Sequence, residues 1–324
     1  MKIAFISPNP SENMGSYRIH VKDLCYYFNR IGIVSSINPN DIHNYNIIIL
    51  QKGIKLDNKI KNTKYQNKKV GIITPSSDDI NTLRSSDFII VGSTEEKESI
   101  IQNNKNCFLF PQIENMYQKV PLKIHEKKDI ITIGYHGNQN HLNHMSIGLK
   151  WALEKLSTTV KIKFTYICKN NKEWIQGKPN IHMEFKKWNI NTIIKDIQQF
   201  DIGIVPSISE ISSENNLNSN LELGIYNTDY KIRFKNKSNI GRSLVLFQCG
   251  IPVVADIIPS NMHILANPDN GYAVASKEGW YYALKELCCE TKRNFIAINA
   301  YNECKRLYNP LDWARRLESQ IKTI

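Results

Sequence analysis

One stretch of the chain, YKIRFKNKSNIGRSLVLFQCGIPVVADIIPSN, gathers residue types that bind anions. Three cations and two residues that commonly cap helices follow one another there: Arg233, Lys235, Lys237, Ser238 and Asn239. The apolar residues after them predict a helix that ends at Gly250, before a buried strand. Because a helix N-terminus carries about half a positive charge and unpaired N–H groups, the combination predicts a diphosphate site. A surface basic cluster beside an ordinarily capped helix is the alternative.

A second loop, GYHGNQNHLNHM, follows a predicted strand. Two glycines bracket its Tyr-His pair, and Gly137 is followed by Asn138, which suits close approach of the backbone to a ligand. We expect His136 to donate a hydrogen bond to phosphate or sugar oxygens. Two further histidines, His141 and His144, lie in the loop, but no carboxylate or cysteine lies beside them, so no metal site is predicted.

A third loop, SPNPSENMGSYR, leads from the opening strand into the first predicted helix. Gly15 and Ser16 stand at the helix entrance and Arg18 lies one turn into the helix, which predicts a loop close to an acceptor or a phosphate. The loop lacks the GxGxxG pattern, so dinucleotide binding is not supported. An ordinary serine cap beside a loop glycine accounts for the same residues equally well.

These loops are expected to follow parallel strands, because short runs of Ile, Val and Phe alternate with amphipathic stretches. The first half contains six predicted strands: 2–6, 33–37, 46–50, 70–74, 88–91 and 107–110. The second half contains six more: 130–135, 161–167, 182–185, 202–205, 251–255 and 272–275. The fold class is therefore α/β, with ligands expected beyond the carboxyl ends of the strands.

The two series of strands predict two Rossmann-like domains, residues 1–125 and 126–309. Residues 112–129 carry no strong periodicity and are interpreted as an inter-domain linker. Apolar residues at helical spacing predict a C-terminal helix within residues 310–324. The Ser- and Asn-rich residues 207–228 predict a loop after a strand.

Composition limits the partners and the location. The chain has 324 residues, of which 41% are hydrophobic, enough to build two cores. Its 42 Lys and Arg outnumber 30 Asp and Glu, and the formal charge of +12 attracts nucleotide diphosphates, anionic membranes or nucleic acid, although solvated lysines also explain it.

Seven scattered cysteines without a CxxC pair indicate a reduced compartment. With no signal peptide or spanning segment evident, we expect a cytoplasmic protein whose membrane contact, if any, is peripheral and at the inner face.

Successive motifs resemble landmarks of GT-B glycosyltransferases, particularly the large retaining group that builds bacterial surface glycans. The motifs are MKIAFISPNP with GSYRIHVKDL, SDFIIVGST, IGYHGN, FDIGIVPS, KNKSNIGRSLVLFQCGIPVVAD and EGWYYALKEL. Their order and spacing carry the resemblance over nearly the whole chain. It implies two Rossmann-like domains that face each other across a cleft, with the C-terminal helix 310–324 packing back on the first domain.

The site residues expected from these motifs fall into three groups. The expected catalytic residues are Arg233, Lys237 and His136. The donor diphosphate is expected at Lys235, Ser238, Asn239, Gly137 and Asn138. The acceptor-side loop is expected to contain Gly15, Ser16 and Arg18.

One departure from the family concerns acidic residues. Many retaining members carry two glutamates eight positions apart, which would fall here on Lys237 and Val245. Both carboxylates are absent, so the donor sugar and the stereochemical outcome stay open. An inverting enzyme needs a general base, for which His20 and His136 are candidates, whereas in a retaining enzyme the leaving phosphate could take the acceptor proton.

We therefore expect a nucleotide-sugar-dependent, hexosyltransferase-like enzyme that acts on a glycan or lipid-linked glycan in polysaccharide biosynthesis. Cations and helix N–H groups, rather than a metal or cofactor, are expected to stabilise the leaving diphosphate. Two alternatives remain. The charge of +12 favours a glycosyltransferase that modifies a DNA base, and the missing glutamates favour a catalytically silent binding protein with the same fold.

Overall fold

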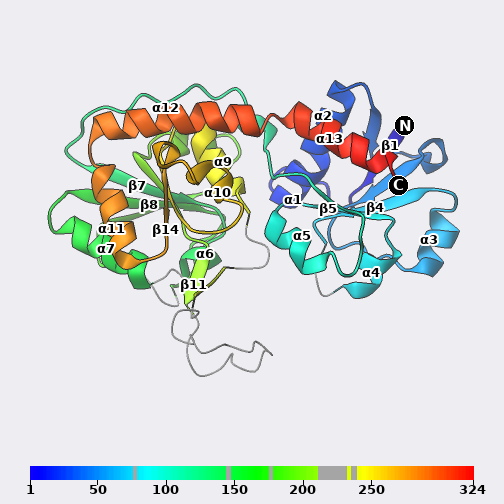
Figure 1. Ribbon diagram of the computed structural model, residues 1–324, viewed down its shortest axis with the longest axis horizontal. Coiled ribbons are helices and arrows are strands. Elements are labelled where there is room, and N and C mark those ends of the chain that lie inside the picture. Colours follow the sequence, from blue (N-terminus) through cyan, green and yellow to red (C-terminus); the bar gives the residue numbers. More distant parts are fainter. Residues whose placement is uncertain (76–78, 144–146, 175–177, 211–231, 235–238) are drawn as a thin grey trace. The chain divides into compact units, whose positions relative to one another are not determined.

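The computed structural model describes residues 1–75, 79–143, 147–174, 178–210, 232–234 and 239–324. The chain divides into two compact units, each built around its own parallel sheet (Figure 1). Unit 1 comprises Met1–Gln118, Asn239–Gly241 and Lys305–Ile324. Unit 2 comprises Lys119–Ser238 and Arg242–Cys304.

The sheet of unit 1 has the order β2-β1-β3-β4-β5-β6, and all its neighbouring strands are parallel. Its strands are β1 (Lys2–Ile6), β2 (Val34–Ile37), β3 (Ile47–Leu50), β4 (Lys69–Ile73), β5 (Phe88–Val91) and β6 (Cys107–Leu109). Both faces of the central strands are buried: Ile47 and Ile49 belong to one apolar cluster, and Ile48 and Leu50 belong to the other. The continuous apolar runs of these strands follow from this double burial.

Helices cover both faces of this sheet. They are α1 (Gly15–Tyr17), the π-helical turn η1 (Arg18–Asp23), α2 (Leu24–Arg30), η2 (Ile42–Asn44), α3 (Asn58–Lys64), α4 (Ile80–Ser85), α5 (Thr94–Ile100), η3 (Asn115–Tyr117) and α13 (Pro310–Lys322). The side chains of Asp57, Asp79 and Ser93 cap α3, α4 and α5, which explains where these helices begin. The C-terminal helix α13 lies beside α2 (Figure 1). Its apolar residues are buried in the apolar cluster that contains Ile47 and Ile49.

The sheet of unit 2 has the order β14-β13-β10-β7-β8-β9 and is also parallel throughout. Its strands are β7 (Ile131–His136), β8 (Ile162–Cys168), β9 (Met183–Lys187), β10 (Ile202–Val205), β13 (Val253–Asp256) and β14 (Tyr272–Val274). Its helices are α6 (Asn140–Asn143), α7 (Ile147–Ser157), α8 (Ile193–Ile197), α9 (Gly241–Gln248), α10 (Met262–Leu265), η4 (Pro268–Asn270), α11 (Lys277–Glu286) and α12 (Glu290–Leu307).

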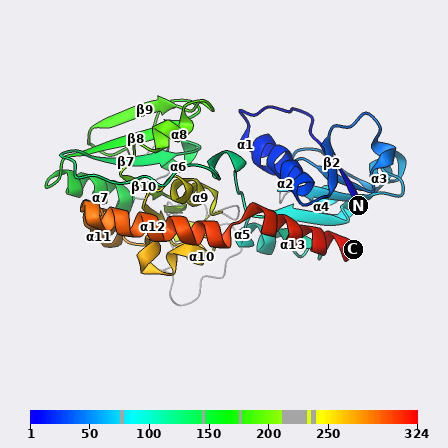
Figure 2. The ribbon, with the colours of Figure 1, turned by 90° about the horizontal axis from the view of Figure 1, so that it is seen from above.

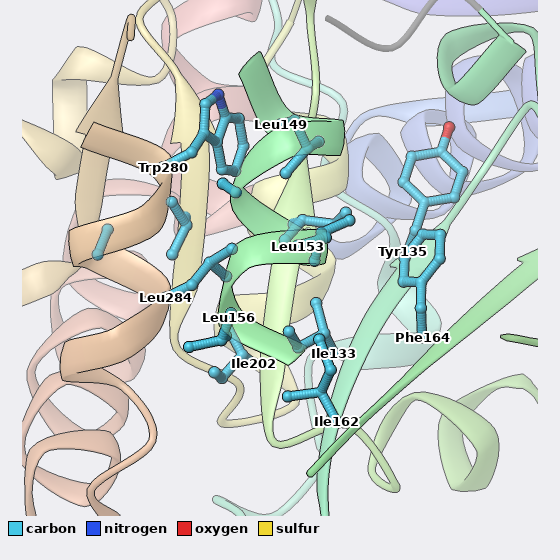
Figure 3. Close-up of a cluster of buried hydrophobic side chains, with 14 of the residues drawn as sticks. Ile133, Tyr135, Leu149, Leu153, Leu156, Ile162, Phe164, Ile202, Trp280 and Leu284 are labelled. Carbon is cyan, nitrogen blue, oxygen red and sulfur yellow. The ribbon is translucent and has the colours of Figure 1, made fainter. Parts of the chain in front are cut away.

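Different helices cover the two faces of this second sheet. Figure 2 shows α7, α11 and α12 on one side of β7, β8 and β9. In the core on that side, Trp280 and Leu284 of α11 pack against Leu149 and Leu153 of α7 (Figure 3). Helix α9 covers the opposite face, where a Cβ atom at Gly203 would lie only 2.7 Å from Leu246, so the helix approaches the sheet closely because of this glycine.

All twelve predicted strands are present in the two sheets, displaced by at most two residues at either end. The prediction of a loop over residues 207–228 is wrong at its start. Strand β11 (Ile208–Glu210) pairs there with the antiparallel strand β12 (Ile232–Phe234), while residues 211–231 lie outside the described part of the chain. Among the described residues, no helix is long and apolar enough to cross a membrane.

Candidate functional site

The order of strands in unit 2 reverses direction between β10 and β7. In open parallel sheets, ligands bind beyond the carboxyl ends of the strands at such a switch point. His136 ends β7, Ser207 follows β10, and Asp256 ends β13. The first turn of α9 brings Arg242 to the same edge, where it contacts the ends of both β7 and β10.

Arg242 is the centre of this edge. Its Nη1 donates to the carbonyl oxygen of Pro206 at 3.1 Å and to the hydroxyl of Tyr135 at 3.4 Å, and its Nη2 donates to Oγ of Ser207 at 3.3 Å. The guanidinium also lies 5.7 Å from the ring centroid of Tyr135. Every described partner is a neutral oxygen or a ring, and no described carboxylate pairs with Arg242. Within the described residues, the positive charge of this half-buried side chain is therefore held in place without a carboxylate that neutralises it.

His136 fixes the start of α9 through a hydrogen bond to the backbone of Arg242. Its Nε2 lies 3.1 Å from the carbonyl oxygen of Arg242, and because a carbonyl only accepts, Nε2 carries the proton. Burial lowers the pKa of His136 to about 4, and the charge of Arg242 contributes in the same direction. The imidazole is therefore neutral at physiological pH. It holds the helix start in position, and its predicted contact with a ligand stays a prediction.

The loop after β7 has little freedom. Gly137 has a φ of +134°, which favours glycine, and its amide donates to the carbonyl oxygen of Ile167 at 3.0 Å. The carbonyl oxygen of Asn138 accepts a 2.7 Å hydrogen bond from Tyr135, whose hydroxyl points away from Phe164 in Figure 3. Gln139 exchanges two hydrogen bonds of 2.6 Å with the backbone of Lys172. Hydrogen bonds within the protein therefore fix the predicted ligand loop.

Buried polar groups also fix the neighbouring turns. The carboxylate of Asp256 accepts a hydrogen bond from the amide of Ser207 at 2.7 Å, which ties the end of β13 to the turn after β10. Asn261 donates to the backbone of Asp256 at 3.2 Å and accepts from Ser243 of α9 at 3.0 Å. A site with its dipoles already oriented stabilises charge without reorganising.

The predicted cations before α9 fall largely outside the described residues. Lys235, Lys237 and Ser238 are among the residues that the structure does not describe, so their contacts with a diphosphate stay predictions. Arg233 lies on β12 opposite Ser209, where only the backbone is described. The described helix begins at Gly241, and Oδ1 of Asn239 accepts a 3.0 Å hydrogen bond from the amide of Gly241.

A metal-binding group is not found in the described part of the chain. No cluster of three or more His, Cys, Asp or Glu residues that could hold an ion occurs there. His141 lies in α6, whereas His144 is outside the described residues.

Unit 1 has a second switch point, between β1 and β3. Ser7 follows β1 and its hydroxyl donates to the side chain of Gln51, which follows β3. Gln51 in turn donates to Oγ of Ser16 at 3.4 Å, so Ser16 lies at this edge, and its acceptor-side role stays a prediction. Gly15 opens α1 beside it, and a Cβ atom there would meet nothing nearer than Ile19 at 3.8 Å.

The described contacts of Arg18 lie within unit 1. It lies 2.8 Å from the carboxylate of Glu114 and donates to the carbonyl oxygen of Glu12 at 2.6 Å. Both members of the ion pair are nearly buried, and burial raises the pKa of Glu114. Arg18 therefore ties the loop to the segment before residue 118, and its predicted contact with an acceptor stays a prediction.

No protein-family model and no curated protein sequence matches the chain. Solved structures do match it. HepE from Anabaena, whose structures contain UDP with glucose or UDP-glucose, is 12% identical over 100% of both chains with a TM-score of 0.65. Sucrose-phosphate synthase from Thermosynechococcus elongatus is 12% identical over 99% of this chain and 98% of its own, with a TM-score of 0.67. A glycosyltransferase from Rickettsia africae is 12% identical with the same coverage and a TM-score of 0.63. The chain therefore has the GT-B fold, with two Rossmann-like domains.

Proposed function

We propose that the chain is a glycosyltransferase that binds the diphosphate of a nucleotide sugar in unit 2, at Arg242. The observation that carries this proposal is a guanidinium at the switch point whose described partners are all neutral. Arginine binds phosphate oxygens through paired N–H groups, and no carboxylate in the described part of the chain competes for this guanidinium. The GT-B fold and the UDP-glucose bound to HepE point to the same class of ligand.

In the proposed reaction, the bond from the sugar to the diphosphate breaks as the acceptor oxygen attacks. Negative charge then grows on the leaving diphosphate. Arg242 and the N–H groups of the first turn of α9 would stabilise that charge, and the fixed surrounding turns would keep the cost of reorganisation low. Arg233, Lys235 and Lys237 would add further positive charge if they reach the same phosphates.

The finer assignments follow from the same chemistry and are also proposals. The transferred sugar would be a hexose, and the acceptor would be a hydroxyl of a glycan or lipid-linked glycan bound by unit 1 near Ser16. With cations at the diphosphate, transfer would need no divalent metal. The formal charge of +12 would favour binding of the enzyme to the anionic inner face of a membrane.

Calorimetric titration of UDP, with UMP as a weaker-binding comparison, tests the proposal. Arg242→Gln should weaken UDP binding about 10- to 150-fold, because a hydrogen bond to a charged group contributes about 1.5–3 kcal/mol. Lys195→Gln is the matched control, since it removes one positive charge from an exposed position on α8. Equal UDP affinity for the parent and a folded Arg242→Gln variant would contradict the proposed site.

A further inference from the structure

An open groove lies at the amino ends of the strands of unit 2, where β7 and β8 begin. Its volume is about 550 Å³. Eight residues, all from unit 2, line it: Ile130, Thr132, Ser157, Lys161, Ile162, Lys163, Ile181 and His182. Strand β7 runs from this groove to His136 at its other end, a length of roughly 16 Å. The groove is therefore separate from the proposed diphosphate site.

One wall of the groove is basic. Lys161, Lys163 and His182 form it, and none of the eight lining residues is a carboxylate. Lys163 pairs with Glu184 on β9 at 2.9 Å. Lys161 and His182 are exposed, and among the described residues neither side chain forms an ion pair or a hydrogen bond. The basic wall therefore has side chains that are available to an anion.

The carboxylate that contacts the backbone of this edge is neutralised inside the protein. Oδ2 of Asp201 accepts from the amide of Thr132 at 2.9 Å, and Oδ1 lies 2.7 Å from Nζ of Lys128. Burial acts to raise the pKa of Asp201, but the hydrogen bonds from Lys128 and Thr132 hold it below its usual range. The side chain of Asp201 has no exposed surface, so it does not oppose an anion in the groove.

The other wall is apolar. Ile162 belongs to the core of the unit, where it lies near Ile133 and Leu156 in Figure 3. Ile181 packs against the same core and is half-buried, whereas Ile130 is 52% exposed. A single exposed isoleucine is ordinary. Here, however, exposed apolar surface lies beside unpaired basic side chains in one groove, which suits a ligand with both characters.

The hydroxyl groups of the groove differ in their availability. Ser157 ends α7, and its hydroxyl already donates to the carbonyl oxygen of Glu154 at 2.7 Å. No described partner takes the hydroxyl of Thr132, which can donate to a phosphate oxygen.

We propose that this groove binds the phosphate of an ester that also carries an apolar group, as an anionic phospholipid does. The phosphate contacts Lys161 and the hydroxyl of Thr132, and the apolar group lies on Ile130 and Ile181. Inorganic phosphate satisfies the basic wall alone, and an uncharged lipid satisfies the apolar wall alone. Two sources supply this chemistry, a membrane and a soluble phosphate ester. The inference does not rest on the proposed function, because it concerns the opposite end of the sheet.

Calorimetric titration of the full chain with matched probes tests the inference. Dihexanoyl phosphatidylglycerol, below its micellar concentration, is compared with glycerophosphoglycerol, which has the same phosphodiester but no acyl chains. We expect the lipid to bind about tenfold more tightly, because burial of about two methylene groups supplies that factor. Dihexanoyl phosphatidylcholine has the same chains and a zwitterionic headgroup, and it should bind more weakly than phosphatidylglycerol. Equal affinity for all three probes, or no binding of any, overturns the inference.

Charge reversal tests the basic wall. Lys161→Glu should weaken binding of dihexanoyl phosphatidylglycerol about tenfold or more, because it removes a hydrogen bond to a charged group. Lys195→Glu makes the same change in net charge at an exposed position of α8 outside the groove, and it should leave the affinity nearly unchanged. Equal effects of the two variants overturn the inference. Both variants should keep the parent affinity for UDP, so the two proposed sites fail or stand separately.

Methyl NMR locates the ligand without reference to affinity. In protein labelled with ¹³C at isoleucine methyl groups, the signals of Ile130 and Ile181 should shift when dihexanoyl phosphatidylglycerol is added. The signal of Ile298, which is 40% exposed on α12, should not shift. Each signal is assigned by its loss in the corresponding valine variant: Ile130→Val, Ile181→Val or Ile298→Val. Binding that leaves both Ile130 and Ile181 unshifted overturns the inference.

Vesicles identify the source of the phosphate ester. If the ligand is a membrane lipid, the chain should sediment with vesicles of equal parts phosphatidylcholine and phosphatidylglycerol, and Lys161→Glu should do so less than Lys195→Glu. Binding of the short-chain lipid without binding to vesicles supports the groove with a soluble phosphate ester as its ligand. Vesicle binding that Lys161→Glu and Lys195→Glu weaken equally contradicts the proposed groove.

Discussion

Replacement of Gly137 by alanine tests whether the loop after β7 is built around Arg242. The φ of +134° at this position is one that a residue with a side chain rarely adopts, so Gly137→Ala should cost about 1–3 kcal/mol of unfolding free energy. For a unit of this size, that loss corresponds to roughly 2–12 °C in Tm.

The added methyl group should also disturb the proposed diphosphate site. Its Cβ would lie 3.1 Å from Cδ of Arg242 and 3.1 Å from the hydroxyl of Tyr135, so both must give way by a few tenths of an ångström. The hydrogen bonds of the guanidinium to Pro206 and Tyr135 are already 3.1 and 3.4 Å long and would lengthen further. We expect UDP affinity to fall about tenfold, which corresponds to about 1.4 kcal/mol.

Two other glycines separate stability from binding in this experiment. Gly271 has a φ of +140° and its Cβ would lie 2.7 Å from Leu265, so Gly271→Ala should lower Tm without weakening UDP binding. Gly15→Ala should change neither, because its added methyl meets nothing within 3.8 Å. Differential scanning calorimetry and titration of UDP measure both quantities. If Gly137→Ala binds UDP as tightly as Gly271→Ala does, the reasoning about Arg242 is refuted.

Two further predictions concern pH and metals. Burial lowers the pKa of His125 and His136 in unit 2 to about 4, below the ordinary 6.5. Below pH 6.5 these histidines are therefore protonated in the unfolded chain but not in the folded unit. The free energy of unfolding is at its full value above pH 6.5 and falls by about 1.4 kcal/mol per histidine per pH unit down to pH 4. Urea unfolding at pH 7.5 and 5 measures this loss, and equal stability would contradict it. In unit 1, burial raises the pKa of Asp23 to about 7 and lowers the pKa of His20. The two shifts change the stability in opposite directions as the pH falls, so the stability of unit 1 should depend less on pH. Transfer should persist in EDTA, and full loss of transfer that magnesium or manganese restores would show that a metal is required.

The strands could be predicted because parallel strands with two buried faces have a distinctive composition. The runs Ile47–Leu50 and Phe88–Val91 are entirely apolar, and no helical spacing competes with them. Strands β11 and β12 have only three residues each and include polar side chains, so their pairing leaves no comparable pattern. Short strands of this kind depend on their partner rather than on local sequence.

The candidate site was only partly predictable, because its centre depends on distant contacts. The sequence indicates a helix start after Lys237, but it does not indicate that Arg242 reaches Tyr135, 107 residues away, and Pro206, 36 residues away. A cation within the first turn of the predicted helix was the available signal. Conversely, Arg18 looks available beside a loop glycine, yet Glu114, 96 residues later, pairs with its guanidinium.

A crystal structure of the full chain with UDP tests the central claim most directly. We predict diphosphate oxygens within hydrogen-bond distance of the Arg242 guanidinium, beside the first turn of α9 and the loop at Gly137. UDP bound with its diphosphate away from all of these groups would contradict the account.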